Sequence, residues 1–380
     1  MKMNDNLRIY FVMDPIRGGG PRNVFNIVKL LNNLGSRSKV LSFHSIKYLD
    51  LLWRRKSVLN FYGAERSIPG NIFSIIDSIT SFSENVRYMY LPVYMLQQFF
   101  IRPIILSRYE IPDVYIATNW QSFFPAMKTA SRFGKKLAYF VQGDETEFSD
   151  SPIFKKEALK TYRNNFPKFT QSKWLAEEMN RKFSVDVKYI GFGIDHSVFY
   201  PRPVERERVI FTIARSEKIK GFSSFVKAVN RLWAKRKDFK VLIAGHKNAV
   251  NNSILEFPFD YIGWITDDDE MANLYTKCIF VNTGLNEALP MPPLEAMACG
   301  GTVVMTLNGG AIEYAKDMLN CLLVRPNDDL DLTNKLDFVL SSESIRDELL
   351  KGAIDTAKKY TWPNFMQNFI GFIEEEVMER

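Results

Sequence analysis

The sequence predicts an α/β protein built from two Rossmann-like, doubly wound domains. Its 380 residues are two to three times the length of an ordinary domain. Hydrophobic residues make up 46% and charged residues 24%, which excludes disordered, collagen-like and disulfide-stapled classes. Short apolar runs rich in β-branched and aromatic residues alternate with helix-length segments throughout the chain. This alternation indicates parallel sheets whose strands are joined by crossover helices.

The apolar runs form two sets of expected strands. The first set covers residues 7–13, 39–43, 86–91, 114–118, 137–141, 168–171 and 187–191. The second set covers residues 209–214, 240–244, 261–264, 279–282, 302–306 and 321–324. Two sets of this size are too large for one compact sheet, so two doubly wound domains fit better.

The domain boundary is expected near residue 200, where Pro201 and Pro203 interrupt the patterning and the charge changes sign. This predicts an N-terminal domain over 1–200 and a C-terminal domain over 201–360. An amphipathic helix within 361–380 should bury its apolar face in a core, with the N-terminal domain as the candidate partner.

The first half of the chain is basic. Residues 1–200 contain 28 Lys and Arg against 17 Asp and Glu, whereas residues 201–380 contain 22 against 26. Either the first half meets an anionic partner, such as a membrane surface or an anionic lipid carrier, or this is a solvated basic surface. The aromatic segment 88–105 likewise either dips into a membrane interface or packs in a core. No nucleic-acid module accompanies the charge, so nucleic acid is not an expected partner.

The expected location is the cytoplasm, either free or peripheral on the inner face of the membrane. The three cysteines are odd in number and lack metal-ligand spacing, which indicates buried thiols in a reducing compartment. Residues 1–6 are polar, so no secretory leader is expected. The longest uncharged apolar stretch, between Arg87 and Arg102, is too short to span a bilayer.

Glycines follow the first predicted strand. Gly18, Gly19 and Gly20 precede a helical stretch over 23–34, where backbone N–H groups can approach a phosphate. The spacing is not Gly-x-Gly-x-x-Gly, and no acidic residue clearly ends the second strand, so a nicotinamide site is poorly supported. A tight turn without a ligand is the alternative.

Two cations follow the strand over 209–214. Arg215 can fork onto two phosphate oxygens, and Lys220 supplies a compact charge beside a glycine. The pair suits a diphosphate that becomes a leaving group, whereas surface solvation is the alternative for either residue alone. Gly309 and Gly310 follow the strand over 302–306 and form either a second anion-binding turn or a plain one.

The most informative segment is 287–300. Glu287 lies in a proline-rich loop after the strand over 279–282, and Glu295 is expected about at the start of a short helix. Leu294, next to Glu295, is also a candidate nucleotide-binding residue. A carboxylate accepts hydrogen bonds from two vicinal hydroxyls, which is how proteins hold a ribose or a sugar ring. One acid near a helix start can simply offset the helix dipole, but two acids around a rigid loop favour a sugar site.

These motifs resemble the family-4 retaining glycosyltransferases of the GT-B fold. Arg215, Lys220 and the following glycine are similar to the family's Arg-x4-Lys-Gly motif, and Glu287 with Glu295 fits its Glu-x7-Glu motif. Two further matches are a Gly-Gly-x-x-Glu turn at 309–313 and the family's entry into the second domain at 193–201. The resemblance covers nearly all of residues 187–376. Over residues 1–186 it rests mainly on the glycine loop and the strand order.

The resemblance implies two Rossmann-like domains facing each other across a cleft, and a reaction. A sugar would pass from a nucleoside-diphosphate sugar to a hydroxyl of a saccharide or lipid-linked acceptor. The anomeric configuration would be retained, with no metal and no other cofactor. The product would belong to a polysaccharide, glycolipid or glycan.

The resemblance also implies roles for the matched residues. Arg215 and Lys220 would stabilise the departing diphosphate, and this demand should dominate catalysis. Glu295 would hold the ribose, and Glu287 would contact the transferred sugar. The backbone N–H groups of Gly19, Gly20 and Gly310 would also bind the diphosphate. The nucleotide base would bind in the region of Gly245, His246 and the loop around Ile265.

The chain departs from the family at three points. Pro290 lies where the family has Gly-Phe-Gly and has no N–H to offer a sugar. No histidine aligns with the family's first-domain His, so Asp144 is the candidate sugar-facing or acceptor-facing group, with a helix cap or turn residue as the alternative. Cys321 replaces a usual glycine. The wording around Asp144 also loosely resembles rhamnosyltransferase-like members.

Two other functions stay open. One is a Rossmann-type, NAD-dependent oxidoreductase that uses Gly18–Gly20 for a dinucleotide, a scheme in which the paired acids and cations have no role. The other is a non-catalytic nucleotide-sugar-binding protein on the same scaffold, motivated by Pro290 and the missing histidine.

Overall fold

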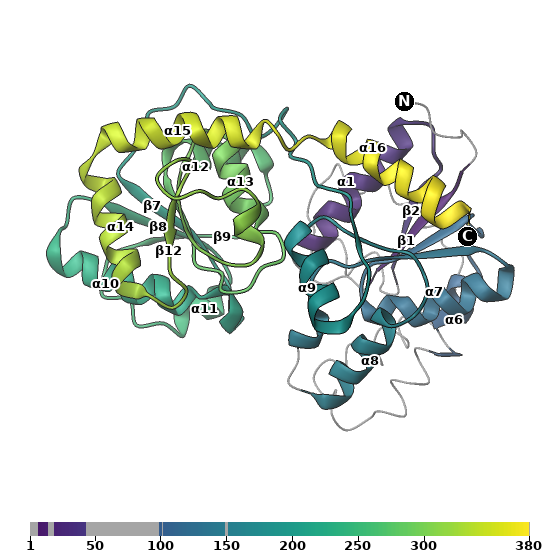
Figure 1. The fold of residues 1–380 in the computed structure, drawn as a ribbon. Helices are drawn as coiled ribbons and strands as arrows, with labels where there is room; N and C mark the ends of the chain where they lie inside the picture. The colour runs from purple at the N-terminus through teal and green to yellow at the C-terminus, as the bar shows by residue number, and fades with distance from the viewer. Residues whose placement is uncertain (1–6, 14–18, 43–98, 101, 149–150, 380) are drawn as a thin grey trace. The chain divides into compact units, whose positions relative to one another are not determined.

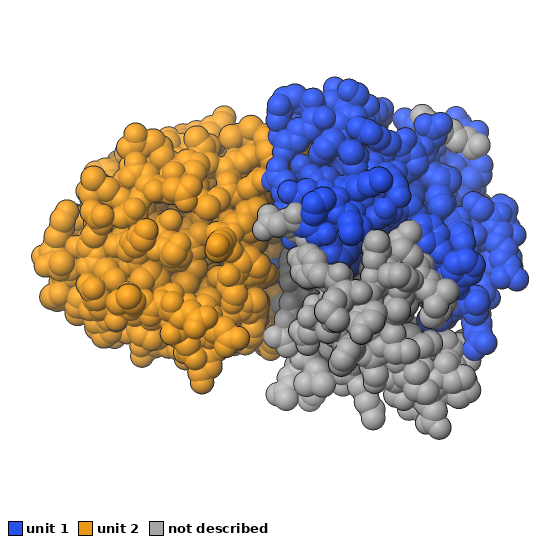
Figure 2. Space-filling view, turned by 90° about the horizontal axis from the view of Figure 1, so that it is seen from below, with its two compact units in different colours: residues 1–171, 176–190, 366–380 blue, residues 172–175, 191–365 orange. Residues whose placement is uncertain are grey.

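The computed structural model describes residues 7–13, 19–42, 99–100, 102–148 and 151–379. The chain forms two compact units, coloured separately in Figure 2. Unit 1 comprises residues 1–171, 176–190 and 366–380, and unit 2 comprises residues 172–175 and 191–365. Each unit is built on its own parallel sheet.

Unit 1 contains a six-stranded sheet in the order β2-β1-β3-β4-β5-β6, with every pair parallel. Its strands are β1 (Ile9–Met13), β2 (Lys39–Ser42), β3 (Val114–Ala117), β4 (Lys136–Phe140), β5 (Lys168–Thr170) and β6 (Lys188–Tyr189). Between them run α1 (Gly19–Asn33), α6 (Arg102–Leu106), α7 (Trp120–Phe133), the 3-10 turn η2 (Glu145–Glu147), α8 (Pro152–Tyr162) and α9 (Lys173–Phe183).

The end of the chain completes unit 1. The helix α16 (Trp362–Phe372) continues into the π-helical turn η5 (Ile373–Met378) and is the yellow helix of Figure 1. Phe369 stacks on Phe11 of β1 at 6.2 Å between ring centroids, and Phe372 packs on Phe169 of β5 at 5.1 Å. These aromatic contacts bury the apolar face that the helical pattern predicts.

Unit 2 contains a second parallel sheet in the order β12-β11-β10-β7-β8-β9. Its strands are β7 (Val209–Ala214), β8 (Lys240–Gly245), β9 (Asp260–Gly263), β10 (Ile279–Asn282), β11 (Thr302–Thr306) and β12 (Leu322–Val324). Its helices are α10 (Phe222–Lys235), α11 (Lys247–Asn251), α12 (Asp268–Lys277), α13 (Met291–Ala298), α14 (Asp329–Ser341) and α15 (Glu343–Ala357), with 3-10 turns η3 (Lys218–Lys220) and η4 (Gly310–Glu313).

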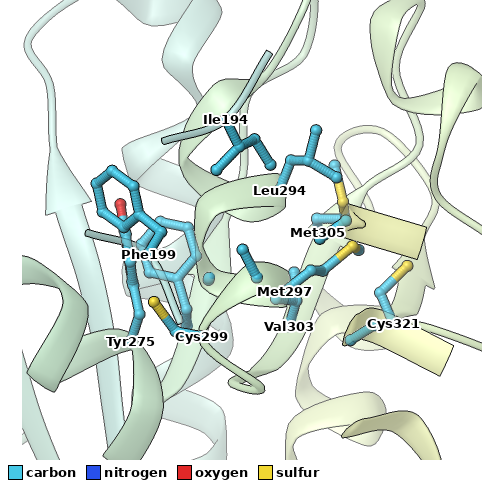
Figure 3. Packing of buried hydrophobic residues seen from close by; sticks show 14 of the residues in the cluster. Ile194, Phe199, Tyr275, Leu294, Met297, Cys299, Val303, Met305 and Cys321 are labelled. Carbon is cyan, nitrogen blue, oxygen red and sulfur yellow. The ribbon is translucent and has the colours of Figure 1, made fainter. Parts of the chain in front are cut away.

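Both faces of the second sheet are covered by apolar side chains. Alternate residues of β7 point to opposite sides, so Phe211 packs towards α12 and α13 while Ile210 packs towards α10 and α14. Figure 3 shows the first of these cores, where Cys299 and Cys321 lie among aliphatic, methionine and aromatic side chains. All three cysteines are free and buried, and burial raises the pKa of each thiol to about 12.

The predicted fold class of two Rossmann-like units is confirmed, and twelve of the expected strands occur within two residues of their predicted ends. The expected strand at 86–91 lies outside the described residues, as does most of the segment 88–105. Among the described residues, no helix is both long and apolar enough to cross a membrane.

The boundary between the units differs from the predicted one at residue 200. The long segment of unit 2 already begins at Gly191, because Ile194 and Phe199 are buried in its core and the Ile194 N–H donates to the Tyr360 carbonyl. The two prolines therefore follow the boundary instead of marking it. At the other end, the return to unit 1 begins at residue 366, five residues after the predicted start.

Candidate functional site

The candidate residues of unit 2 lie on loops that leave the carboxyl ends of its strands. From β7 the chain moves to β8 and β9 on one side, and then crosses to β10, β11 and β12 on the other. The strand order therefore reverses between β7 and β10, and such a switch point is where open parallel sheets bind ligands. Arg215 and Lys220 follow β7, Glu287 follows β10, and Gly310 follows β11.

Lys220 and Glu287 meet across this switch point. The Lys220 ammonium donates to Glu287 Oε1 at 2.6 Å, and the two side chains are 32% and 11% exposed. The second oxygen, Oε2, is buried and has no hydrogen-bond partner within the described part of the chain. Since a buried carboxylate oxygen without a partner is costly, this atom is a ready acceptor for a hydroxyl donor.

Backbone contacts hold the two loops together. The Leu285 N–H donates to the Ile219 carbonyl at 2.8 Å, and the Thr283 hydroxyl donates to the Lys220 carbonyl at 3.2 Å. Gly221 has φ +65°, and a Cβ there would lie 2.0 Å from the Thr283 carbonyl oxygen. Only glycine permits both this conformation and this close approach, so the glycine after Lys220 fixes where the lysine lies.

The loop after β11 adds a third contact to the same place. The Gly310 N–H donates to the Glu287 carbonyl at 2.9 Å, and a Cβ on Gly310 would lie 2.1 Å from the Ala288 carbonyl oxygen. The predicted anion-binding N–H of Gly310 is thus bonded to the protein itself. At the end of η4, Glu313 accepts from the Ser172 hydroxyl at 2.6 Å and from the Trp174 N–H at 3.2 Å.

Arg215 lies in a cluster that extends to the loops after β8 and β9. Its guanidinium donates to both carboxylate oxygens of Glu217, from Nη2 at 2.7 Å and from Nε at 3.3 Å. It also lies 5.8 Å from the centre of the Trp264 ring, and that ring packs edge-on against His246 at 5.1 Å. Sequence reasoning missed Glu217 and Trp264, because nothing in their spacing shows that three loops converge here.

The other donor-site candidates are more buried. Gly245 ends β8, where a Cβ would lie 2.3 Å from the Ala214 carbonyl oxygen, and the partly buried Ile265 packs on the core. The His246 side chain is 25% exposed and Trp264 is 42% exposed, so these two rings are the side chains that this region presents. The Leu294 side chain is fully buried in the core and cannot contact a donor. Glu295 is 4% exposed and is the fifth residue of α13, in its second turn and not at its start.

In unit 1, the predicted glycine turn lies at the start of α1. Gly18 is outside the described residues, and Gly19 and Gly20 are the first two residues of the helix. A Cβ on Gly20 would lie 2.5 Å from Gln142 Oε1, and the Gln142 amide donates to the Thr118 carbonyl at 3.0 Å. The helix N-terminus and the loops after β3 and β4 are therefore in contact at the carboxyl edge of this sheet.

Asp144 caps a turn and pairs with a lysine. Its Oδ1 accepts from the Thr146 N–H and hydroxyl, at 3.1 and 2.6 Å, and its Oδ2 accepts from Lys182 at 3.1 Å. Both oxygens of this 5%-exposed side chain are engaged. The structure thus favours the helix-cap interpretation of Asp144 over a sugar-facing role.

The neighbouring Glu145 is a buried acid that sequence reasoning missed. Its Oε2 accepts from the Tyr139 hydroxyl and from the Trp120 N–H at 2.9 Å, and its own N–H donates to the Tyr162 hydroxyl at 2.7 Å. Burial raises the pKa of Glu145 to about 8, more than its hydrogen bonds lower it. The carboxyl is therefore largely protonated at neutral pH and ties β4 to the start of α7.

We expect the stability of the protein to fall between pH 5 and 8 because of Glu145. Its pKa is 4.5 in an exposed chain and about 8 in the fold, so the folded state binds the extra proton over this interval. The free energy of unfolding should then decrease by about 1 kcal/mol per pH unit and level off above pH 8. Glu145→Gln, which cannot ionise, should flatten this slope in urea denaturation curves, and an unchanged slope would contradict the assignment.

The chain resembles known proteins over different lengths. Residues 197–359 match the family model described as glycosyl transferases group 1. The D-inositol 3-phosphate glycosyltransferase of Stackebrandtia nassauensis is 31% identical over 112 residues, which are 29% of this chain and 25% of that protein. The N,N'-diacetylbacillosaminyl-diphospho-undecaprenol alpha-1,3-N-acetylgalactosaminyltransferase of Campylobacter jejuni is 28% identical over 187 residues, 44% of this chain and 48% of that protein. The chain thus spans a quarter to about half of these relatives.

Solved structures match over nearly the whole chain. Anabaena Alr3699/HepE in complex with UDP and glucose has a TM-score of 0.74 at 15% identity, covering 97% of this chain and 99% of its own. A glycosyltransferase from Rickettsia africae has a TM-score of 0.68 at 17% identity, covering 98% and 99%. At these identities the likeness shows the fold, which is GT-B.

Proposed function

We propose, from the premise that residues 197–359 form a domain of the glycosyl transferases group 1 family within a GT-B chain, that this protein is a retaining glycosyltransferase. It would move a sugar from a nucleoside-diphosphate sugar to an acceptor hydroxyl in the synthesis of a polysaccharide, glycolipid or glycan. The observation that supports this most is the Lys220–Glu287 pair at the switch point between β7 and β10, with Arg215 on the same loop as Lys220.

The charged side chains at the carboxyl edge of the second sheet would each act in this reaction. As the bond from the sugar to the diphosphate breaks, negative charge grows on the leaving oxygens, and Lys220 and Arg215 would stabilise it. Glu287 would accept a hydrogen bond from a hydroxyl of the donor sugar. Its Oε2 has no partner among the described residues and can accept this bond, and its Oε1, now bonded to Lys220, could accept one as well. Glu295 would bind the ribose hydroxyls. Because fixed cations supply the charge, we propose that no metal is required.

A panel of nucleoside-diphosphate sugars with and without EDTA tests this proposal. We expect one donor to be consumed with retention of the anomeric configuration, at an equal rate in both conditions. UDP, GDP or dTDP should bind more tightly than NAD in calorimetric titrations. Tighter binding of NAD would favour an oxidoreductase, and binding of a nucleotide sugar without turnover of any donor would favour a non-catalytic binding protein.

Glu295→Ala should weaken nucleotide binding more than it slows turnover. A carboxylate that holds two ribose hydroxyls contributes to the donor and to the transition state alike, so its loss raises KM and Kd with a small change in kcat. We expect a Kd for the nucleoside diphosphate that is weaker by about a hundredfold or more, from the loss of two hydrogen bonds to a charged group. Inorganic pyrophosphate, which has no ribose, should bind both proteins alike, and an unchanged nucleotide Kd would remove the ribose role.

We also propose that unit 1 meets an anionic membrane, which would bring a lipid-linked acceptor within reach. Phe100 and Ile104 are 59% and 50% exposed, and the Lys128 ammonium lies 4.7 Å from the centre of the Phe100 ring. Exposed aromatic and aliphatic groups beside cations suit a membrane interface. Co-sedimentation with anionic vesicles at low and high salt measures this, and no binding at low salt would contradict it.

A further inference from the structure

We propose that Glu217 competes with the diphosphate of the donor and of the product for Arg215, and so limits how tightly the protein holds both. This inference rests on the proposed function, because it requires a diphosphate at Arg215 and Lys220. Glu217 is not part of the motifs described above. Loss of its charge should tighten binding of the diphosphate.

The geometry of the Arg215–Glu217 pair is that of the phosphate contact it would replace. Two guanidinium donors of Arg215, Nη2 and Nε, point to the two carboxylate oxygens of Glu217. A diphosphate would be bound through the same planar fork, since arginine presents adjacent N–H groups to paired oxygens. The guanidinium carbon also lies 5.8 Å from the centre of the Trp264 ring, so the cation is in a cluster with an aromatic side chain of a second loop.

Glu217 can leave this pair without disturbing the loop. Its side chain is 46% exposed, whereas that of Arg215 is 19% exposed, so the carboxylate is the partner with access to water. Glu217 precedes η3 but forms no side-chain cap bond with it. The turn is closed by the backbone, through the Lys220 N–H and the Glu217 carbonyl at 2.9 Å. A substitution of the side chain therefore leaves the position of Lys220 unchanged.

The second cation is held differently. Glu287, the partner of Lys220, is 11% exposed and lies against Gly284, where a Cβ would be 2.3 Å from its Oε2. This carboxylate cannot swing out to water as Glu217 can. Of the two acids bonded to the cations, Glu217 is thus the one that a diphosphate can displace.

The charge on Glu217 is present at neutral pH. Burial by itself would raise the pKa of this carboxyl, but the hydrogen bond and charge of Arg215 bring it below its ordinary value, with His246 also facing it. An anionic ligand arriving at Arg215 therefore meets a competing negative charge. Because the pair is partly exposed, the expected penalty is that of a surface ion pair.

Calorimetric titration of Glu217→Gln with the nucleoside diphosphate that binds the wild type most tightly tests the proposal, with inorganic pyrophosphate as a second probe. We expect the Kd of both to fall by about threefold to fivefold. A matched control is Asp238→Asn, because Asp238 pairs with Arg236 at the same i, i+2 spacing and precedes β8 at the opposite edge of the sheet. This control should leave both values unchanged.

The Arg215→Ala background identifies the mechanism. If Glu217 acts through Arg215, adding Glu217→Gln to Arg215→Ala should give no further change in Kd. Equal tightening in both backgrounds would overturn the proposal, since the effect would then be a long-range field. So would weaker or unchanged binding in Glu217→Gln alone, or a change for the nucleotide without one for pyrophosphate. If the wild type binds no nucleoside diphosphate, the proposed function itself fails.

Discussion

Lys220→Ala should lower kcat by ~10²-fold or more, which is the scale for removing one preorganised group that stabilises transition-state charge. The ammonium lies on the loop after β7, bonded to Glu287 across the switch point of the sheet. Charge on the leaving diphosphate is larger in the transition state than in the bound donor. The loss should therefore appear in kcat and kcat/KM, with a smaller change in donor affinity.

Lys218→Ala is the matched control for this variant. Lys218 carries the same charge in the same 3-10 turn, but its side chain is exposed whereas that of Lys220 is half-buried against Glu287. Its turnover should stay within a fewfold of the wild type. Near-normal turnover in Lys220→Ala, or an equal fall in Lys218→Ala, would contradict the diphosphate assignment. A thermal melt of each variant separates a catalytic effect from unfolding, because Lys220→Ala also leaves the 11%-exposed Glu287 without its cation.

Gly221→Ala should have two effects at once: it should destabilise unit 2 and displace Lys220. An L-residue at φ +65° costs roughly 1–2 kcal/mol, and the Cβ would also meet the Thr283 carbonyl oxygen at 2.0 Å. The backbone of one loop must then move, which parts the loops after β7 and β10. We expect a loss of about 2 kcal/mol or more, a melting midpoint lower by about 4–8 °C, and a clear fall in kcat.

Gly263→Ala isolates the conformational part of this effect. Gly263 ends β9 in the same unit with φ +73°, and apart from its chain neighbours no described residue lies within 4 Å of a Cβ built there. Gly263→Ala should lower the free energy of unfolding only by the cost of placing an L-residue in a left-handed backbone conformation, and its turnover should stay that of the wild type. If Gly221→Ala is no more harmful than Gly263→Ala, the close approach to Thr283 does not position Lys220.

The strands could be predicted because their cause is local. Runs such as Val209–Ala214 and Thr302–Thr306 are apolar on both faces and bounded by helix-length segments, so their buried position in a parallel sheet follows from composition. The boundary between the units could not be predicted in this way, because prolines affect only the local conformation of the chain. The placement of Ile194 and Phe199 in the second core depends on contacts with residues far along the sequence.

The same division applies to the candidate site. Motif spacing selected Lys220 and Glu287, and the structure brings them to 2.6 Å of each other. Spacing could not distinguish a sugar-facing Asp144 from one that caps a turn, because only the fold places Lys182 beside it. Nor could it identify Glu145, whose burial depends on tyrosines from β4 and α8.

The amino-acid order alone determined which residues of this protein are strands, which loops contain the paired acids and cations, and that there are two sheets. These properties depend on neighbours a few positions apart, where hydrophobic period and residue type act directly. The tertiary structure alone decided that Glu287 pairs with Lys220 and that Glu145 is buried, which raises its pKa to about 8. Charge pairing and burial depend on distance in space, and the fold sets that distance between loops that are far apart in the chain.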